Sequence, residues 1–239
     1  MISIVCVYNK KELLTNDLLK SLKRQNRKYD FVGVDNTKNR FKSAAEALNY
    51  GFTLTNQKSN YVFFVHQDVV LENKNDLQKI EIEIKKIKKM GVAGFAGKDN
   101  KNNRIGFIKQ INETWGSVIY SCKKVCTLDE CGLIISREIF EKHKFDSDVF
   151  DGWHCYGADY CLWANENDLK VIVLPIGIRH NCTWQAFLDN KLYYYQKKLL
   201  KKYNYHMIYM TCGKVSTLAL SIKIIISKIK IIIKRIING

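Results

Sequence analysis

The eight cysteines of this 239-residue sequence lack the spacing of a structural zinc site. Cys122, Cys126 and Cys131 are spaced more widely than C-x-x-C, and no second pair follows them. This pattern argues against structural zinc. The first residues, from Met1 on, read directly as a strand and not as a signal peptide. We therefore expect a cytoplasmic protein whose thiols are all free.

The sequence also lacks the motifs of several nucleotide-binding and nucleic-acid-binding classes. The glycine-rich stretch 91–97 does not read G-x-G-x-x-G and no convincing helix follows it, which argues against a dinucleotide-binding fingerprint. A Gly-rich first loop bearing Arg or Lys, as expected of a sugar-nucleotide-forming nucleotidyltransferase, is missing. Zinc fingers and aromatic RNA-binding signatures are missing too, so we expect no nucleic-acid partner.

Acidic residues are few compared with basic ones. The chain has 39 Lys and Arg against 23 Asp and Glu, a formal net charge of +16. This balance favours anionic partners such as nucleotides or an acidic membrane surface. The hydrophobic fraction of 46% is enough for a substantial core, and there is no internal repeat or long linker. We expect one domain at 1–212 and a tail at 213–239.

The tail lacks the uninterrupted apolar run of a membrane-spanning helix. Five cations within residues 221–237 argue against a span. At 100° per residue they fall within about half of the helix circumference, and most of the isoleucines occupy the other half. We predict a basic amphipathic helix that contacts an anionic membrane surface through 214–237, on the inner face of the cell membrane. A helix packed on the domain or on a partner is the alternative.

Apolar segments and helical periodicities alternate along the first third of the chain. Strands are predicted at 2–7, 31–34 and 61–65, with helices at 14–22 and 44–54 between them. Asn9 and Glu12 fit a capping box at the start of the first helix. This β-α-β-α-β order predicts parallel strands with crossover helices, the nucleotide-binding half of an α/β fold. Further helices are predicted at 75–90, 158–165 and 193–203, and further strands at 91–97, 118–126, 132–136 and 171–174.

The third strand runs into the polar triplet His66-Gln67-Asp68. Ligands of open α/β sheets bind at the carboxyl ends of the strands. A metal-capable carboxylate therefore lies where such folds do chemistry, although Gln67 and Asp68 could also simply begin a turn.

Three more positions carry polar groups that suit a site. Asp35 ends the second strand, where it could bind a base or ribose or form a turn with Asn36. The segment 151–159 packs aromatics, glycines, a His and two acids just before a helix, and the helix dipole favours Asp159 in its first turn. His180 follows an apolar stretch. A histidine there is usually structural, and it becomes a candidate ligand because the other polar positions accompany it in the sequence.

Together these motifs resemble the family-two glycosyltransferases of the GT-A fold, especially the bacterial branch with HQD in place of DxD. The resemblance covers roughly residues 1–190. It implies an α/β fold with a Rossmann-like, mixed and mostly parallel sheet flanked by helices. It also implies inverting transfer of a sugar, most simply from a UDP-sugar, with Mn²⁺ or Mg²⁺, to a hydroxyl of a surface-glycan or lipid-linked acceptor in polysaccharide biosynthesis.

The resemblance also assigns roles to the polar positions. The donor would bind at Asp35, Asn36, His66, Gln67 and Asp68, and the metal at Asp68 and His180. The acceptor-site candidates are Trp153, His154 and Tyr156.

The general base is where the sequence departs from the family. The family often reads Glu-Asp-x-Asp before the late helix, and here Gly157 stands at the usual base position. Asp159 matches the later acid and is the expected base, with Asp151 as the second choice and His154 as another candidate. The alternative is a non-catalytic, nucleotide-binding scaffold in glycan assembly.

Overall fold

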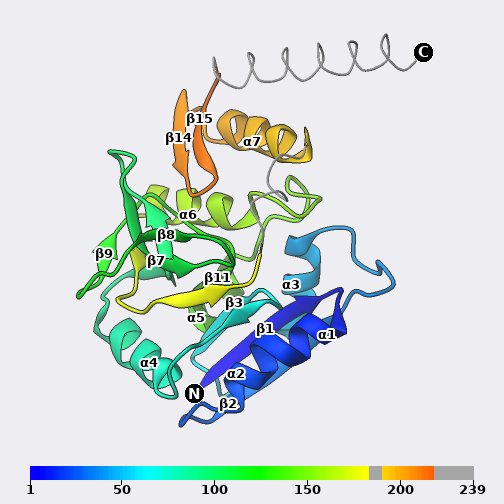
Figure 1. Ribbon diagram of the computed structural model, residues 1–239. Coiled ribbons are helices and arrows are strands. Elements are labelled where there is room, and N and C mark those ends of the chain that lie inside the picture. Colours follow the sequence, from blue (N-terminus) through cyan, green and yellow to red (C-terminus); the bar gives the residue numbers. More distant parts are fainter. Residues whose placement is uncertain (183–189, 218–239) are drawn as a thin grey trace.

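The computed structural model describes residues 1–182 and 190–217. A seven-stranded mixed sheet with strand order β2-β1-β3-β11-β5-β12-β9 forms its centre, with helices against it (Figure 1). Residues 183–189 and 218–239 lie outside the described residues, and the predicted amphipathic tail therefore falls almost entirely outside them.

The first half of the sheet has the predicted β-α-β-α-β order. Strand β1 (Ile2–Tyr8) pairs in parallel with both β2 (Tyr29–Asp35) and β3 (Tyr61–Val65). The first crossover is a continuous helical segment made of α1 (Lys11–Leu13), the π-helical η1 (Leu14–Leu19) and α2 (Lys20–Leu22). The second is α3 (Ala44–Thr53), whose N-cap Ser43 accepts a hydrogen bond from the backbone of Glu46. These connections bring the carboxyl ends of three parallel strands to one edge.

The second half of the sheet adds strands in both directions. Strand β11 (Gly132–Ser136) runs antiparallel to β3 and to β5 (Met90–Gly94), while β12 (Lys170–Val173) is parallel to β5 and antiparallel to β9 (Lys123–Lys124). Helix α4 (Asp76–Lys86) confirms the helical prediction for its segment. The fold class expected from the sequence is confirmed, and β11 and β9 are the strands that make the sheet mixed.

A second sheet lies beside the first. Its order is β10 (Thr127–Leu128), β6 (Ala96–Lys98), β7 (Arg104–Lys109), β13 (Ile178–His180) and β4 (Val69–Val70), with β8 (Thr114–Ser117) on β7. The strand predicted at 91–97 is divided between the two sheets. The strand predicted at 118–126 is wrong except at β9, because Val118 and Tyr120 are 58% and 94% exposed and have no core to face.

The core fills both faces of the central sheet, and the side chains of β3 alternate between the two. Val62 and Phe64 pack with α3, α5 (Arg137–Lys142) and α6 (Tyr156–Glu166). Phe63 and Val65 pack with the helical segment 11–22 and with α4. This burial on both faces explains why the apolar run of β3 is continuous.

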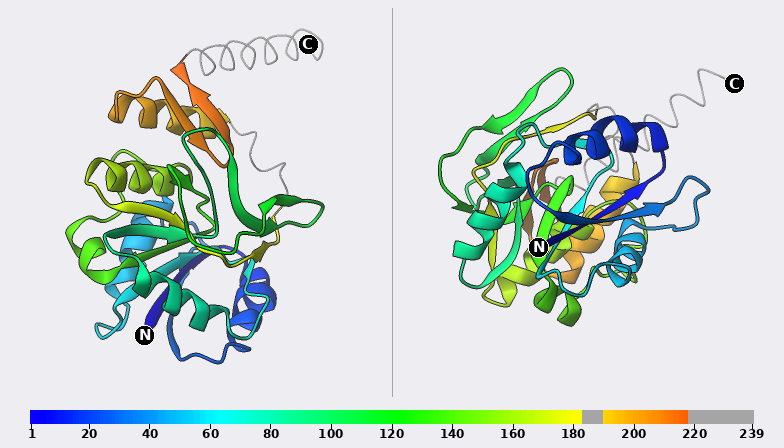
Figure 2. Two further views of the ribbon diagram at one scale, coloured as in Figure 1. Left: turned by 90° about the vertical axis from the view of Figure 1, so that its left-hand side faces the viewer. Right: turned by 90° about the horizontal axis from the view of Figure 1, so that it is seen from below.

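An outer layer covers α6 on the side away from the sheet. It consists of α7 (Asn190–Lys202) and the hairpin of β14 (Met207–Met210) and β15 (Gly213–Ser216), as the left view of Figure 2 shows. Thr127 Oγ1 donates a hydrogen bond to the Tyr209 carbonyl over 2.6 Å, which ties the hairpin to the second sheet. The boundary predicted between 212 and 213 falls at the turn of this hairpin.

Candidate functional site

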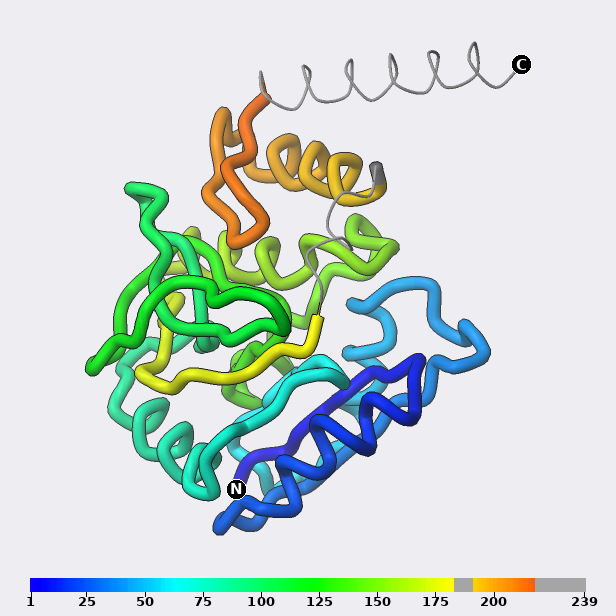
Figure 3. The backbone as a smooth tube through the Cα atoms, in the orientation of Figure 1, coloured from blue at the N-terminus to red at the C-terminus, as the bar shows by residue number. Residues whose placement is uncertain are grey.

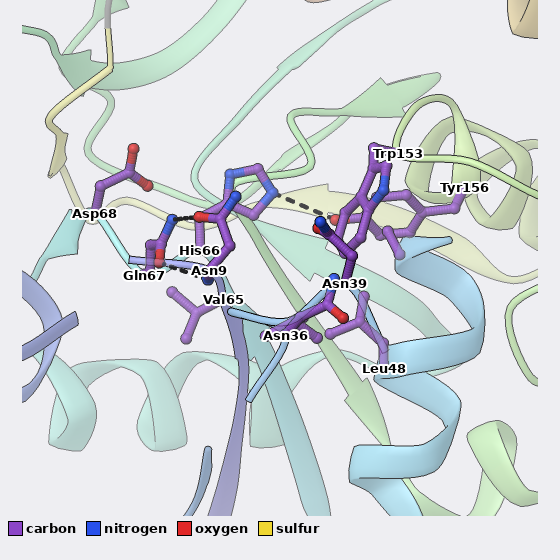
Figure 4. Close-up of a pocket in the computed structure, with 12 residues that line it drawn as sticks. Asn9, Asn36, Asn39, Leu48, Val65, His66, Gln67, Asp68, Trp153 and Tyr156 are labelled. Atoms are coloured by element: carbon purple, nitrogen blue, oxygen red, sulfur yellow. Dashed lines mark hydrogen bonds between the residues drawn. The ribbon is translucent and has the colours of Figure 1, made fainter. Parts of the chain in front are cut away.

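A cavity of about 470 Å³ opens at the carboxyl ends of the first three strands. Figure 4 shows its lining, which comes from the strand ends, the loop after β2, helix α3 and the start of α6. The lining residues are Val7, Asn9, Asn36, Asn39, Ala44, Leu48, Val65, His66, Gln67, Asp68, Trp153 and Tyr156. One cavity therefore contains Asp68 and five more of the residues predicted to bind the donor or the acceptor. These five are Asn36, His66, Gln67, Trp153 and Tyr156.

One corner of this cavity gathers three groups that can bind a metal ion. Asp68 follows β3, and the antiparallel pairing of β13 with β4 places His180 opposite Val69. In Figure 3 the yellow segment that carries His180 runs next to the cyan segment that carries Asp68. His180 Nε2 lies 3.2 Å from Asp68 Oδ1, and one ligand atom from each of His66, Asp68 and His180 lies within 4.8 Å of the others.

At this corner Asp68 is held ionised and His66 neutral, which suits a cation, whereas His180 holds a proton. Burial opposes ionisation of Asp68, but the hydrogen bond and positive charge of His180 lower its pKa to about 2. Burial also opposes the charge on His180, yet Asp68 and Cys182 raise its pKa to about 10. Burial and the charge of His180 lower the pKa of His66, which favours its neutral form. A metal ion would take the place of the proton on His180, because a ligating imidazole must be neutral.

A second group of ligand-type side chains shares His180. Asp129 and Cys131 place one atom each within 4.8 Å of one another and of His180. The two groups differ in one respect: His66 and Asp68 line the cavity, and Asp129 and Cys131 do not.

Gln67 fixes the turn between β1 and α1. Its Oε1 accepts hydrogen bonds from the backbone N–H groups of Asn9 and Lys10, at 3.1 and 3.0 Å. Its Nε2 donates to Asn9 Oδ1 over 2.8 Å. The predicted capping box is therefore wrong: the N-cap is Lys10, without a side-chain hydrogen bond, because the side chain of Asn9 is bound to Gln67.

The pair at the end of β2 is ordered mainly by its own loop. Asp35 is exposed, and Thr37 donates to its Oδ1 from both backbone N–H and hydroxyl, which lowers the pKa of Asp35. Asn36 is buried and exchanges two hydrogen bonds with the backbone of Phe41. Only Asn36 of this pair lines the cavity. The pair thus shapes the rim next to the strand ends.

Trp153 connects this cavity to a second one of about 670 Å³. Trp153 is 44% exposed and lines both. The second cavity lies between the segment before α6 and the start of α7, and its other lining residues are Lys42, Asp151, Gly152, His154, Lys191, Tyr194 and Tyr195. Aromatic faces and cations thus adjoin the first cavity.

The two acids predicted as bases pair with lysines of α7. Asp159 is 1% exposed, and its Oδ1 lies 2.7 Å from Lys202 Nζ and accepts from the Tyr203 hydroxyl over 2.8 Å. Asp151 Oδ1 lies 2.8 Å from Lys198 Nζ in the wall of the second cavity. Neither acid lines the cavity that holds the metal-binding corner.

Glu130 is an acid that the sequence did not single out; it lies beside the start of α6 and is not among the lining residues of either cavity. Its carboxylate contacts the first turn of α6, and burial raises its pKa to about 7. The sequence signal is weak, because an Asp-Glu pair before a strand looks like an ordinary turn and the contact spans 27 residues.

Among the described residues, no helix is both long and apolar enough to span a membrane. This finding concerns residues 1–182 and 190–217 alone.

The sequence profile of the glycosyltransferase like family matches residues 2–203. No sequence among functionally curated proteins matches this chain. The profile match rests on sequence alone and agrees with the resemblance carried by the motifs.

Solved structures with the same fold include three whose bound ligands are named. S. aureus TarS in complex with UDP-GlcNAc is 14% identical, with a TM-score of 0.54 over 84% of this chain and 66% of its own. GalNAc-T7 with UDP, GalNAc and Mn²⁺ is 12% identical, with a TM-score of 0.63 over 84% and 47%. The mannosyltransferase PcManGT from Pyrobaculum calidifontis, with GDP-Man and Mn²⁺, is 11% identical, with a TM-score of 0.53 over 82% and 60%. The likeness confirms the fold, and this chain spans no more than about two thirds of each of the three.

Proposed function

This chain belongs to the glycosyltransferase like family, and from that premise we propose that it transfers a sugar from a nucleotide-diphosphate donor to an acceptor hydroxyl with inversion and with the help of a divalent cation. The observation that carries the proposal is the pairing of His180 with Asp68, whose side chain lines the cavity at the strand ends. Asp68 and His180 would hold the cation there, which would supply positive charge to offset that of the leaving diphosphate.

The donor occupies the cavity of about 470 Å³. UDP, UDP-GlcNAc and GDP-Man in the three related structures support a nucleotide sugar, and Mn²⁺ in two of them supports Mn²⁺ or Mg²⁺ as the cation. Asp35 and Asn36 bind the nucleoside at the end of β2, and His66, Gln67 and Asp68 border the diphosphate. His180 completes the metal site with Asp68.

The acceptor enters from the second cavity. Trp153 provides an exposed aromatic face between the two cavities, with His154 and Tyr156 beside it. Lys42 and Lys191 add positive charge to the lining, which suits a glycan or lipid-linked acceptor that carries negative charge. Such an acceptor fits a protein held at an anionic membrane surface by residues 214–237, and a surface-glycan pathway in a bacterial cytoplasm.

The geometry described above does not identify which residue removes the proton from the acceptor hydroxyl. Asp159 as the base, with Asp151 as second choice, stays a prediction from the sequence, and both carboxylates pair with lysines of α7. The glycine at position 157 favours a second candidate function, a nucleotide-binding scaffold without transfer.

Nucleotide release tests the proposal. The full chain is incubated with Mn²⁺ and a panel of UDP- and GDP-sugars, and free UDP or GDP is measured with and without glycan acceptors. We expect metal-dependent release with at least one donor. Binding of nucleotide without release from any donor would support the scaffold instead.

A further inference from the structure

Glu130 holds a carboxylate against the first turn of α6. Its Oε1 accepts hydrogen bonds from the backbone N–H of Gly157 over 2.9 Å and of Ala158 over 3.4 Å. The residue precedes β11 and is partly exposed. A carboxylate from a distant segment of the chain thus stands where α6 begins.

The absence of a side chain at Gly157 makes room for Glu130. A Cβ atom at position 157 would lie 2.8 Å from Glu130 Cγ, 2.8 Å from Leu133 Cδ1 and 3.4 Å from Glu130 Oε1. Carbon atoms do not approach that closely without a shift of one side chain. An acid at position 157 and Glu130 in its present place therefore exclude each other. The carboxylate of Glu130 occupies the space beside the position at which the resemblance expects the base.

One residue joins Glu130 to the donor cavity. The Tyr156 hydroxyl donates to the Glu130 carbonyl oxygen over 3.3 Å and lies 3.4 Å from His66 Nε2. Tyr156 lines the cavity together with His66. The backbone of Glu130 is therefore adjacent to the wall between the donor cavity and the start of α6, and its carboxylate lies behind that wall against Gly157.

We propose that Glu130 is the general base of the transfer reaction, in place of the acid missing at Gly157. This role rests on the proposed function. The Glu130 carboxylate takes the proton of the acceptor hydroxyl while that oxygen bonds to the anomeric carbon. The bond from the anomeric carbon to the diphosphate oxygen breaks, and its electron pair leaves with the nucleoside diphosphate. Asp68 and His180 would hold a cation that offsets the charge on that leaving group.

The surroundings of Glu130 suit a base that works near neutral pH. Burial raises its pKa to about 7, against the opposing effect of the backbone hydrogen bonds from α6. The titratable groups that face it are Asp129 from its own segment, Cys155, Tyr156 and Cys161 from the α6 segment, and Cys212 from the hairpin turn. None of these described groups is a cation. A base whose pKa lies near the working pH is ionised in a large fraction of the molecules, and its carboxylate is still basic enough to accept a proton.

The variant Glu130→Gln distinguishes a role as general base from a role that is limited to hydrogen bonding with the first turn of α6. Gln keeps an oxygen that accepts from Gly157 and Ala158, but it cannot take a proton. We expect kcat for UDP-sugar turnover, measured as UDP release with Mn²⁺, to fall on the order of 100-fold or more. The affinity for UDP should change less than about threefold, and the rise of kcat with pH near 7 should disappear. Glu138→Gln, an exposed acid on α5, is the matched control.

A swapped acid gives a second, independent readout. Glu130→Ala should be inactive, and Glu130→Ala with Gly157→Asp should recover at least about tenfold in kcat, because Glu130 then leaves the space beside position 157 and only the end of the Leu133 side chain must shift. Full kcat in Glu130→Gln would overturn the base assignment and leave the proposed function standing. Wild-type protein that releases nucleotide from none of the donors would defeat the proposed function itself, and the base role with it.

Discussion

Asp68 and His180 are 112 positions apart in the sequence, and their side chains meet at 3.2 Å between Oδ1 and Nε2. Two short strands of the second sheet produce this contact, because β13 pairs with β4 immediately after the central strand β3 ends. The contact ties the metal-binding corner to the edge of the sheet that binds nucleotides in α/β folds.

The three hydrogen bonds of Gln67 predict a positioning role next to this corner. Gln67→Leu keeps the side-chain volume but loses all three bonds to Asn9 and Lys10. We expect a loss of about 1–2 kcal/mol in the free energy of unfolding and weaker UDP binding, because the turn after β1 loosens. Urea unfolding and calorimetric titration with UDP measure the two effects. Asn9→Ala removes one bond of the three and should have a smaller effect on both, and equal values for all three proteins would contradict this role.

The buried carboxylate of Asp159 makes Lys202 important for stability. Lys202→Met would leave Asp159, which is 1% exposed, without its cation. Removing one partner of a buried ion pair costs about 3 kcal/mol or more. The exposed neighbour Lys201 provides the control through Lys201→Met. Urea midpoints that fall equally in the two variants would show that the ion pair contributes nothing specific.

Trp153 should affect the acceptor more than the fold. The side chain is 44% exposed between the two cavities, so Trp153→Ala removes little core. We expect KM for the acceptor to rise about tenfold, because a lost aromatic contact costs roughly 1 kcal/mol or more, with the unfolding midpoint unchanged. Tyr120→Ala, at a 94% exposed aromatic outside both cavities, is the control for steady-state kinetics. An unchanged acceptor KM would remove Trp153 from the acceptor site.

The raised pKa of Glu130 predicts a pH-dependent cost to folding. Burial raises this pKa from 4.5 to about 7, so the folded protein binds the proton more tightly than the unfolded chain does. The stabilisation is fully present below about pH 4.5 and is lost as pH rises through about 7. Relative to Glu130→Gln, the wild type should lose stability over this window, by roughly 3 kcal/mol at most and less where solvent reaches the carboxylate. Urea unfolding at pH 4.5 and pH 8 measures it, and a constant difference between the two proteins would contradict the raised pKa.

The sequence predicts best those helices and strands whose apolar faces are buried in the folded protein. The apolar run Tyr61–Val65 is a strand with those same bounds because both of its faces are covered. Helix α4 follows from Leu77, Ile80 and Ile84, which share one buried face. The predicted strand at 118–126 fails because exposed apolar residues such as Val118 imitate a strand pattern.

Long-range contacts explain what the sequence could not predict at the site. His66, Gln67 and Asp68 follow from the position of β3 in the sheet. The partners of Asp159 and Asp151 come from α7, and no local pattern in the sequence connects these segments. Glu130 reaches Gly157 only because β11 lies between β3 and β5. The glycine itself was visible in the sequence, but the carboxylate that fills its space was not.

Calorimetric titration of UDP in the presence of Mn²⁺ tests the metal-binding corner most directly. Wild-type protein should bind UDP at least about tenfold more tightly with Mn²⁺ than with EDTA. Asp68→Asn should lose this gain, and it should also unfold at a lower temperature than Asp148→Asn, an exposed control, because it removes one partner of the buried pair with His180. The account is contradicted if Asp68→Asn keeps the full Mn²⁺-dependent affinity for UDP.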